Sequence, residues 1–102
     1  MQLKLTGRHF EITPTLKAHV TERFDRLSRY NTHILEGEVV LFRDHVNDIA
    51  EGKIHLGHIV LAAKGEAADM FGAVGDLADK LLIQLQRHEG RLRDRKRHLS
   101  EE

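Results

Sequence analysis

The sequence predicts an α+β fold with the element order β-α-β-β-β-α, in which two helices pack on one face of a four-stranded mixed sheet. Short segments alternate apolar and polar residues with the period of a strand. Two longer segments repeat apolar residues every three or four positions, as helices do, and a glycine separates the last two strand-like segments. At 102 residues the chain is expected to form one domain.

Four strands are predicted. QLKLTG at residues 2–7 alternates, and EGEVVLF indicates a second strand at 36–43. After a loop, AEGKIHLGHIVLAAKGE predicts a hairpin with strands near 49–56 and 59–66 and with Gly57 at its turn. Because a strand–helix–strand unit crosses over in a right-handed sense, the first two strands are expected to be parallel, and the last three form a meander.

The first helix is predicted over residues 14–30. Thr13 is suited to cap it, and Pro14 is suited to the first helical position, where its missing N–H costs nothing. One face is apolar at spacings of four, four and three, which are typical of a helix packed on a core. These residues are Leu16, Val20, Phe24 and Leu27.

The second helix is predicted to open at the N-cap residue Asp69 and to continue to about residue 98. Gly90 is expected to let its basic end fray or bend, since a helical glycine costs roughly 1 kcal/mol relative to alanine. The apolar stripe that should lie on the sheet consists of Phe71, Val74, Ala78, Leu81, Leu85, His88 and Leu92.

The charges are separated along a chain that is neutral overall. Residues 1–35 carry a net charge of +3, residues 36–79 of −6 and residues 80–98 of +5, and Glu101 and Glu102 add −2. A partner responds to the local field rather than to the total, so both a basic and an acidic surface are expected.

Several function classes are poorly supported. The chain has no cysteine, which excludes disulfides and thiol chemistry and fits a reducing cytosol, and it shows no signal peptide or membrane-length apolar run. His55 and His58 flank the hairpin turn, but no zinc-binding pattern accompanies them, and neither serine lies in a nucleophile-type turn. We therefore expect no catalytic residue, metal, cofactor, small-molecule substrate or membrane association.

The basic residues suggest a nucleic-acid surface. Lys80, Arg87 and Arg91 share one stripe of the second helix. The first helix carries a similar stripe with His19, Arg23 and Arg26, and with Arg29 close by. If the helices pack side by side, the stripes could merge into one ridge for phosphates. The alternative is a solvated helix face, with cations favoured near a helix C-terminus.

The five aromatic residues form no stacking platform, which favours RNA recognised by shape and phosphates. The acidic region 36–79 leaves a second class of function open. It could bind a basic protein partner, repel RNA and so orient the domain, or be a plain soluble face.

The segments MQLKLTGRHFEITPTLKAHV and DMFGAVGDLADKLLIQLQRH together resemble the ribosome hibernation-promoting factor family, also called ribosome-associated inhibitor, ribosomal subunit interface protein or sigma-54 modulation protein. The resemblance spans residues 1–95. It implies a domain shaped like double-stranded-RNA-binding domains, and a cytoplasmic protein that occupies the decoding channel of the small ribosomal subunit in stationary phase or stress. There it would overlap mRNA and tRNA and keep ribosomes inactive.

The resemblance also bears on organisation. Residues 1–98 are expected to form a single ribosome-binding domain and residues 99–102 a disordered tail. The short members of the family lack the second domain that pairs ribosomes, so any pairing here would need a separate dimerising factor. The sigma-factor name of the family fits the alternative of a protein-interaction regulator that uses the acidic sheet region.

The family's basic helix positions match Arg23, Arg26, Lys80, Arg87 and Arg91, which are also the residues found by spacing. The full set expected to bind RNA is Arg23, Arg26, Arg29, Lys80, Arg87, Arg91, Arg93, Arg95, Lys96 and Arg97. Phe71 stands where the family usually has tyrosine, and Ile83 and Glu89 replace commonly basic residues. The contacts are therefore expected to shift toward the C-terminus.

Overall fold

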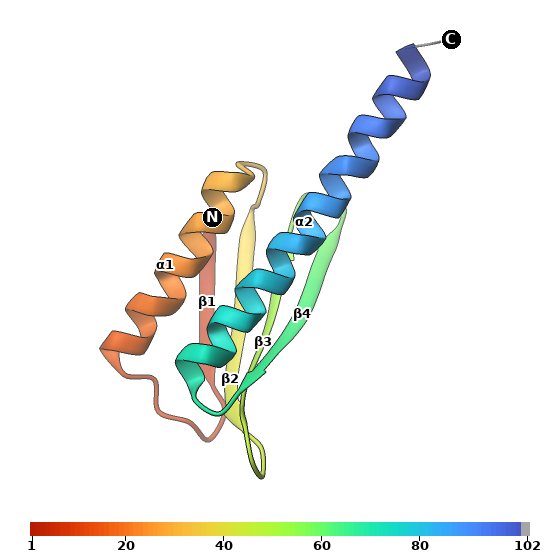
Figure 1. Cartoon of the computed structure of the whole chain (residues 1–102). Coiled ribbons are helices and arrows are strands. Elements are labelled where there is room, and N and C mark those ends of the chain that lie inside the picture. Colours follow the sequence, from red (N-terminus) through yellow and green to blue (C-terminus); the bar gives the residue numbers. More distant parts are fainter. Residues whose placement is uncertain (101–102) are drawn as a thin grey trace.

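The computed structural model describes the backbone of residues 1–100 and the side chains of residues 1–89. Two helices lie on one face of a four-stranded sheet, which confirms the predicted fold class (Figure 1). The elements in chain order are β1 (Gln2–Gly7), α1 (Pro14–Tyr30), β2 (Glu36–Arg43), β3 (Asp48–His55), β4 (Val60–Ala67) and α2 (Met70–Ser100). Only β3 and β4 differ from the predicted strand bounds, each by one residue.

The sheet has the spatial order β1-β2-β3-β4. β1 pairs with β2 in parallel, and the other neighbours are antiparallel, so the predicted crossover and meander are confirmed. The register places Leu5 opposite Val39 and Val39 opposite Gly52, and these residues face the helices. The opposite face of the sheet carries no helix and is called the open face below (Figure 1).

α1 begins as its sequence predicts. The Thr13 hydroxyl accepts a hydrogen bond from the Leu16 N–H at 3.2 Å, and Pro14 occupies the first turn. The helix ends at Tyr30 and is capped by Asn31, whose N–H donates to the Leu27 carbonyl at 2.9 Å. The four predicted apolar residues of α1 are all buried, and they pack with residues of β2, β3 and α2 in one core.

α2 is capped by Asp69, which accepts a hydrogen bond from the Gly72 N–H at 2.8 Å. The expectation that Phe71 faces the sheet is wrong, because its side chain is 44% exposed. Met70 takes the sheet-facing position instead, since it stands at helical spacing from the buried Ala73 and Leu77. The other described members of the predicted stripe are buried, except His88, which is half-buried. The side chain of Leu92 lies outside the described residues.

Glycine is required at two positions, at one by close packing and at the other by a turn. A Cβ at Gly65 of β4 would lie 2.1 Å from the Ala73 carbonyl oxygen of α2, so glycine lets α2 approach the sheet closely. Gly57 has a φ of +76° in the β3–β4 turn, the left-handed region that glycine adopts without strain. Gly57 therefore has the predicted role.

α2 extends well past the sheet (Figure 1). Among the side chains that the structure describes, Leu85 is the last one of α2 in the buried core, and the helix continues through Gly90 to Ser100. The molecule is consequently elongated, with extents of 54 × 25 × 19 Å. The projecting part of α2, residues 90–100, is called the arm below, and its sequence is strongly basic.

Candidate nucleic-acid interface

The ten residues predicted to bind RNA fall into three groups in the structure. Arg23, Arg26 and Arg29 lie on α1, and Lys80 and Arg87 lie on the part of α2 beside the sheet. The others belong to the arm, and their side chains lie outside the described residues: Arg91, Arg93, Arg95, Lys96 and Arg97.

Arg23 joins the two helices. Its Nη2 donates to the main-chain carbonyl of Gly75 at 3.2 Å and to the carboxylate of Asp79 at 3.0 Å. The Arg23 side chain is only 25% exposed, so much of it is covered by protein. A phosphate could reach this guanidinium only by competing with two partners already on α2. Arg23 is therefore primarily a link between helices.

Two more polar contacts join α1 to α2. The Nε2 of His19 lies 3.3 Å from the Phe71 carbonyl oxygen, and the two rings are 5.2 Å apart. At the other end of the helices, the amide of Asn31 donates to the Glu89 carboxylate at 3.1 Å. With the contacts of Arg23 they form a line that we call the polar seam. No local pattern in the sequence indicates this seam, because its partners are 52 to 58 positions apart.

The other two arginines of α1 differ in their surroundings. Arg26 pairs with Glu22 one turn earlier at 2.8 Å, and both side chains are more than half exposed. Such exposed pairs contribute only about 0.3–0.5 kcal/mol, so a phosphate can displace Glu22 readily. The Arg29 side chain is exposed and makes no ion pair or hydrogen bond with any described residue. Arg29 is thus directly available to a ligand.

Lys80 contacts the free edge of the sheet. Three side chains of α2, each one turn from the next, bond the outward main-chain groups of β4. The bonds join Gln84 Nε2 to Ala62 O (2.7 Å), Lys80 Nζ to Lys64 O (2.9 Å) and Asp76 Oδ2 to Glu66 N (3.1 Å). They occupy an edge that could otherwise pair with a foreign strand. Lys80 also pairs with Asp76 at 3.0 Å, and its side chain stays 50% exposed.

The two predicted stripes do not merge into one ridge. Gly75 and Asp79 lie on the flank of α2 that faces α1, because they contact Arg23. Lys80 contacts β4 and therefore lies on the opposite flank, and Arg87 follows it two turns later on the same flank. The cations of α1 and α2 consequently form two patches separated by the outer face of α2.

Most acidic residues of the region 36–79 have structural roles, and of these the sequence indicated only the capping role of Asp69. Asp48 is buried and pairs with Arg43 at 2.6 Å. The others cap or hold main-chain groups and cations: Asp44 in the β2–β3 turn, Asp69 at the start of α2, Asp76 at the β4 edge and Asp79 in the polar seam. The carboxylates of these residues are thus largely engaged in hydrogen bonds and ion pairs within the domain.

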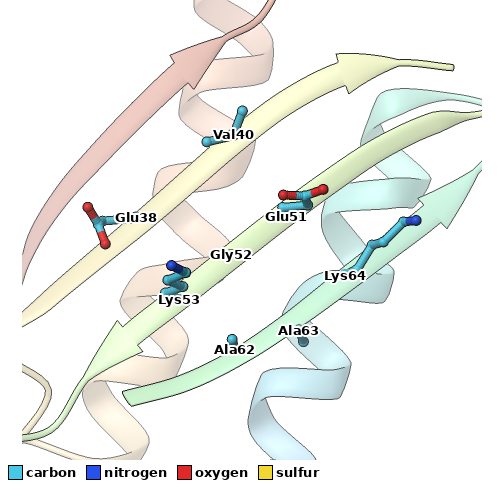
Figure 2. A pocket seen from close by; sticks show the side chains of 8 residues that line it. All are labelled: Glu38, Val40, Glu51, Gly52, Lys53, Ala62, Ala63 and Lys64. Carbon is cyan, nitrogen blue, oxygen red and sulfur yellow. The ribbon is translucent and has the colours of Figure 1, made fainter. Parts of the chain in front are cut away.

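The open face of the sheet has interleaved charges around a shallow hollow of about 480 Å³ (Figure 2). Lys4 and Lys53 flank Glu38 on the neighbouring strands, and Glu51 lies opposite Lys64. Glu38 accepts a hydrogen bond from His55 at 2.9 Å, which holds the pKa of Glu38 below its ordinary value of 4.5, with Lys53 and Lys4 contributing. The face is a mixture of both signs rather than an acidic surface.

The histidines with described side chains do not gather into a metal site. Among residues with described side chains, no three His, Cys, Asp or Glu residues are placed to hold a metal ion. The His55 ring is hydrogen-bonded to Glu38, and His58 lies beyond the end of β3, in the β3–β4 turn. No helix in the described part of the chain has both the length and the apolar character needed to span a membrane.

Comparisons with known proteins agree with this architecture. The family model described as Sigma 54 modulation protein / S30EA ribosomal protein matches residues 3–93. A ribosome hibernation promoting factor of Klebsiella oxytoca is 36% identical over 93 residues, which cover 91% of this chain and 98% of that protein. Its counterpart in Salmonella typhimurium is 38% identical with the same coverage.

Two solved structures have the same fold. The N-terminal domain of Thermus thermophilus Protein Y has a TM-score of 0.78 and 31% identity, and covers 86% of this chain and 99% of that one. A ribosomal subunit interface protein from Coxiella burnetii has a TM-score of 0.84, with 88% of this chain and 99% of that one covered. At 22% identity the second likeness concerns the fold alone.

Proposed function

The chain belongs to the Sigma 54 modulation protein / S30EA ribosomal protein family, whose members are non-enzymatic binding proteins, and on that premise we propose that it is a ribosome hibernation factor that inhibits translation. It binds the channel of the small ribosomal subunit through phosphates of rRNA. In that position it occludes the mRNA and tRNA sites during stationary phase or stress. The proposed site of action is the cytoplasm, where its ribosomal partner resides.

The observation that supports the RNA contact is the distribution of available cations. The side chains of Arg29 and Arg87 are exposed and make no ion pair or hydrogen bond with the described residues. The arm adds five Lys or Arg residues against one acid in residues 90–98. Most acids of region 36–79, by contrast, are engaged within the domain. A phosphate-rich surface is therefore attracted to the helix side and the arm.

Occlusion of the mRNA and tRNA sites depends on the shape of the domain and involves no chemical reaction. A rigid domain with a projecting helix can fill a channel, and phosphate contacts position it without reading sequence. The predicted contacts are then of two kinds. Arg29, Arg87 and the arm bind directly, whereas Arg23, Arg26 and Lys80 must exchange an existing partner for a phosphate.

The second candidate, a regulator that binds a basic protein through the acidic sheet region, has less support. Region 36–79 has a net charge of −6, but its aspartates are largely used in internal contacts. On the open face, Glu38 and Glu51 alternate with lysines of neighbouring strands. A basic partner would meet nearly equal numbers of both signs there.

The test is co-sedimentation of the purified full chain with small ribosomal subunits at several salt concentrations. If about six phosphates are neutralised, the log–log slope of affinity against salt should have a magnitude of about 4–5. A flat salt response, or recovery of the protein only at the top of the gradient, would contradict the proposal.

Charge reversal separates the two candidates. Arg29→Glu with Arg87→Glu should abolish co-sedimentation, whereas Glu36→Lys with Glu38→Lys should leave it intact or slightly stronger. The reverse result would favour the protein-interaction regulator. Lys53→Glu with Lys64→Glu on the open face is the matched control, because it changes the charge by the same amount on a surface assigned no RNA contact.

A further inference from the structure

A hollow of about 770 Å³ lies where α2 leaves the sheet, at the base of the arm. It is formed by the α1–β2 loop, the β3–β4 turn and the last packed turn of α2 (Figure 1). Its apolar residues are Leu35, Leu56 and Ile59, and its histidines are His33, His58 and His88. Its volume lies within the range of small-molecule sites, about 300–1,000 Å³.

The backbone around the hollow is held in place. Leu35 donates its N–H to the His55 carbonyl at 2.8 Å and accepts from the Gln2 N–H at 3.2 Å, and Leu56 donates to Ile59 at 2.9 Å. Although its main chain is fixed, the Leu35 side chain is 62% exposed. An exposed leucine on a rigid segment is a preformed apolar contact, which lowers the entropy cost of binding.

The interior side of the hollow is also fixed. Asn31 is only 9% exposed, accepts from the His33 N–H at 2.8 Å and donates to Glu89 at 3.1 Å. These bonds anchor the loop that carries His33 to α2. Because the Glu89 carboxylate lies on this side, a phosphate is favoured only at the outer rim, near His33 and His58.

The chemistry of the lining selects one class of ligand. Apolar side chains suit the flat face of an unstacked RNA base, because the contact removes both surfaces from water. Imidazole N–H groups at the rim suit the attached phosphate. The three histidines do not form a metal site among the described residues. The arm begins beside the hollow, so a phosphate chain drawn to the arm passes its mouth.

We propose that this hollow binds one unstacked nucleotide of an RNA strand, with its base against Leu35, Leu56 and Ile59 and its phosphate at His33 and His58. The inference rests on the proposed function, because it assumes that the protein contacts RNA. It adds a base-binding site to a surface that otherwise contacts phosphates alone.

The direct test is an NMR titration of the isotope-labelled full chain with 5′-AMP, inorganic phosphate and a blocked tryptophan peptide. We expect 5′-AMP to shift the methyl signals of Leu35, Leu56 and Ile59 together with the ring signals of His33 and His58. Inorganic phosphate should shift the ring signals alone. Absence of methyl shifts with 5′-AMP overturns the proposal, and so does tighter binding of the peptide, which would indicate a protein partner.

The functional test uses variants in two turns at opposite ends of the sheet. Leu35→Ala with His58→Ala should weaken the affinity for small ribosomal subunits at least about 5-fold, because it removes an apolar contact of the base and a hydrogen-bond donor to the phosphate. Val46→Ala with His45→Ala is the matched control, because Val46 is 83% exposed in the β2–β3 turn, and it should have no effect.

The two proposals fail in different ways. If the wild-type chain does not bind subunits, the proposed function is wrong, whatever the NMR titration shows. If it binds, but the Leu35 and His58 variant binds equally well and 5′-AMP shifts nothing in the hollow, only the nucleotide site is wrong.

Discussion

Arg23 of α1 donates a hydrogen bond to the main-chain carbonyl of Gly75 on α2, at 3.2 Å. An arginine that stands in a basic stripe of the sequence is thereby used to hold two helices together. The same guanidinium bonds Asp79 at 3.0 Å. A basic residue in the stripe is thus not necessarily an RNA contact. Its role in linking the helices can be separated from RNA binding by experiment.

The first prediction concerns Arg23 and Arg29. Arg23→Ala removes the central contact of the polar seam and should destabilise the domain by about 1 kcal/mol, the net value of a typical hydrogen bond. The melting temperature should fall by about 4–8 °C, measured by circular dichroism. Arg29→Ala should leave the melting temperature unchanged but weaken subunit binding. Equal melting temperatures for both variants would contradict the role assigned to Arg23.

The second prediction concerns two glycines near the α2 backbone. A Cβ at Gly65 would overlap the Ala73 carbonyl oxygen at 2.1 Å and the Leu77 nitrogen at 2.4 Å. Gly65→Ala must push α2 away from β4, and overpacking of this kind costs about 1–3 kcal/mol or more. We expect a lower urea midpoint for this variant.

Gly75→Ala is the matched control for Gly65→Ala. A Cβ at Gly75 would lie 3.6 Å from the Arg23 side chain, an ordinary contact distance. Alanine is a better helix former by about 0.8–1 kcal/mol, so Gly75→Ala should raise the urea midpoint. Opposite signs for the two substitutions would establish how closely α2 sits on the sheet. Equal effects would show that the packing at Gly65 is looser than the structure indicates.

The third prediction concerns Asp76 at the β4 edge. The Glu66 N–H and the Lys80 ammonium hold the pKa of Asp76 below its ordinary value of 3.8. A carboxylate with a lowered pKa in the folded state contributes stability that is complete above the unfolded value and is lost as pH falls through the folded value. Asp76→Asn should therefore be less stable than the wild type at pH 7, and the difference should shrink below pH 3.8.

The measurement for Asp76 is urea unfolding of both proteins between pH 7 and pH 2.5. Other carboxylates with lowered pKa values, Glu38 and Asp44, affect both proteins equally and cancel in the difference. Asp25→Asn is the control, since the Asp25 carboxylate is exposed and makes no hydrogen bond or ion pair with the described residues. If the stability difference between the wild type and Asp76→Asn did not depend on pH, the charge of Asp76 would not be what stabilises the β4 edge.

The fold was predictable from the sequence because local signals agree with one another. Thr13 and Pro14 start α1, Asp69 starts α2, and Gly57 makes the turn, each for a local physical reason. The position of Phe71 was not predictable in this way, because spacing alone cannot tell which of two adjacent apolar residues faces the sheet at a helix end. Met70 takes that position in the structure.

The candidate site was predictable only in part. Which residues are basic and which helix carries them follows from the sequence. Whether a cation is available depends on partners distant in the chain: Asp79 is 56 positions from Arg23, and Lys64 is 16 positions from Lys80. No local pattern reports such contacts. The hollow at the base of the arm was not predictable for the same reason, since three separate segments form it.

The last prediction concerns the arm. Replacing its five Lys and Arg residues with glutamine should reduce the salt slope of subunit binding by about 0.7–0.9 for each phosphate that is no longer neutralised. The residues are Arg91, Arg93, Arg95, Lys96 and Arg97. We expect stability to be unaffected, because Leu85 is the last residue of α2 in the buried core among residues 1–89, whose side chains the structure describes. Replacing three lysines of the open face, Lys4, Lys53 and Lys64, is the comparison variant. If both variants reduce the slope equally per charge removed, binding depends on net charge alone, and the arm has no specific place in the interface.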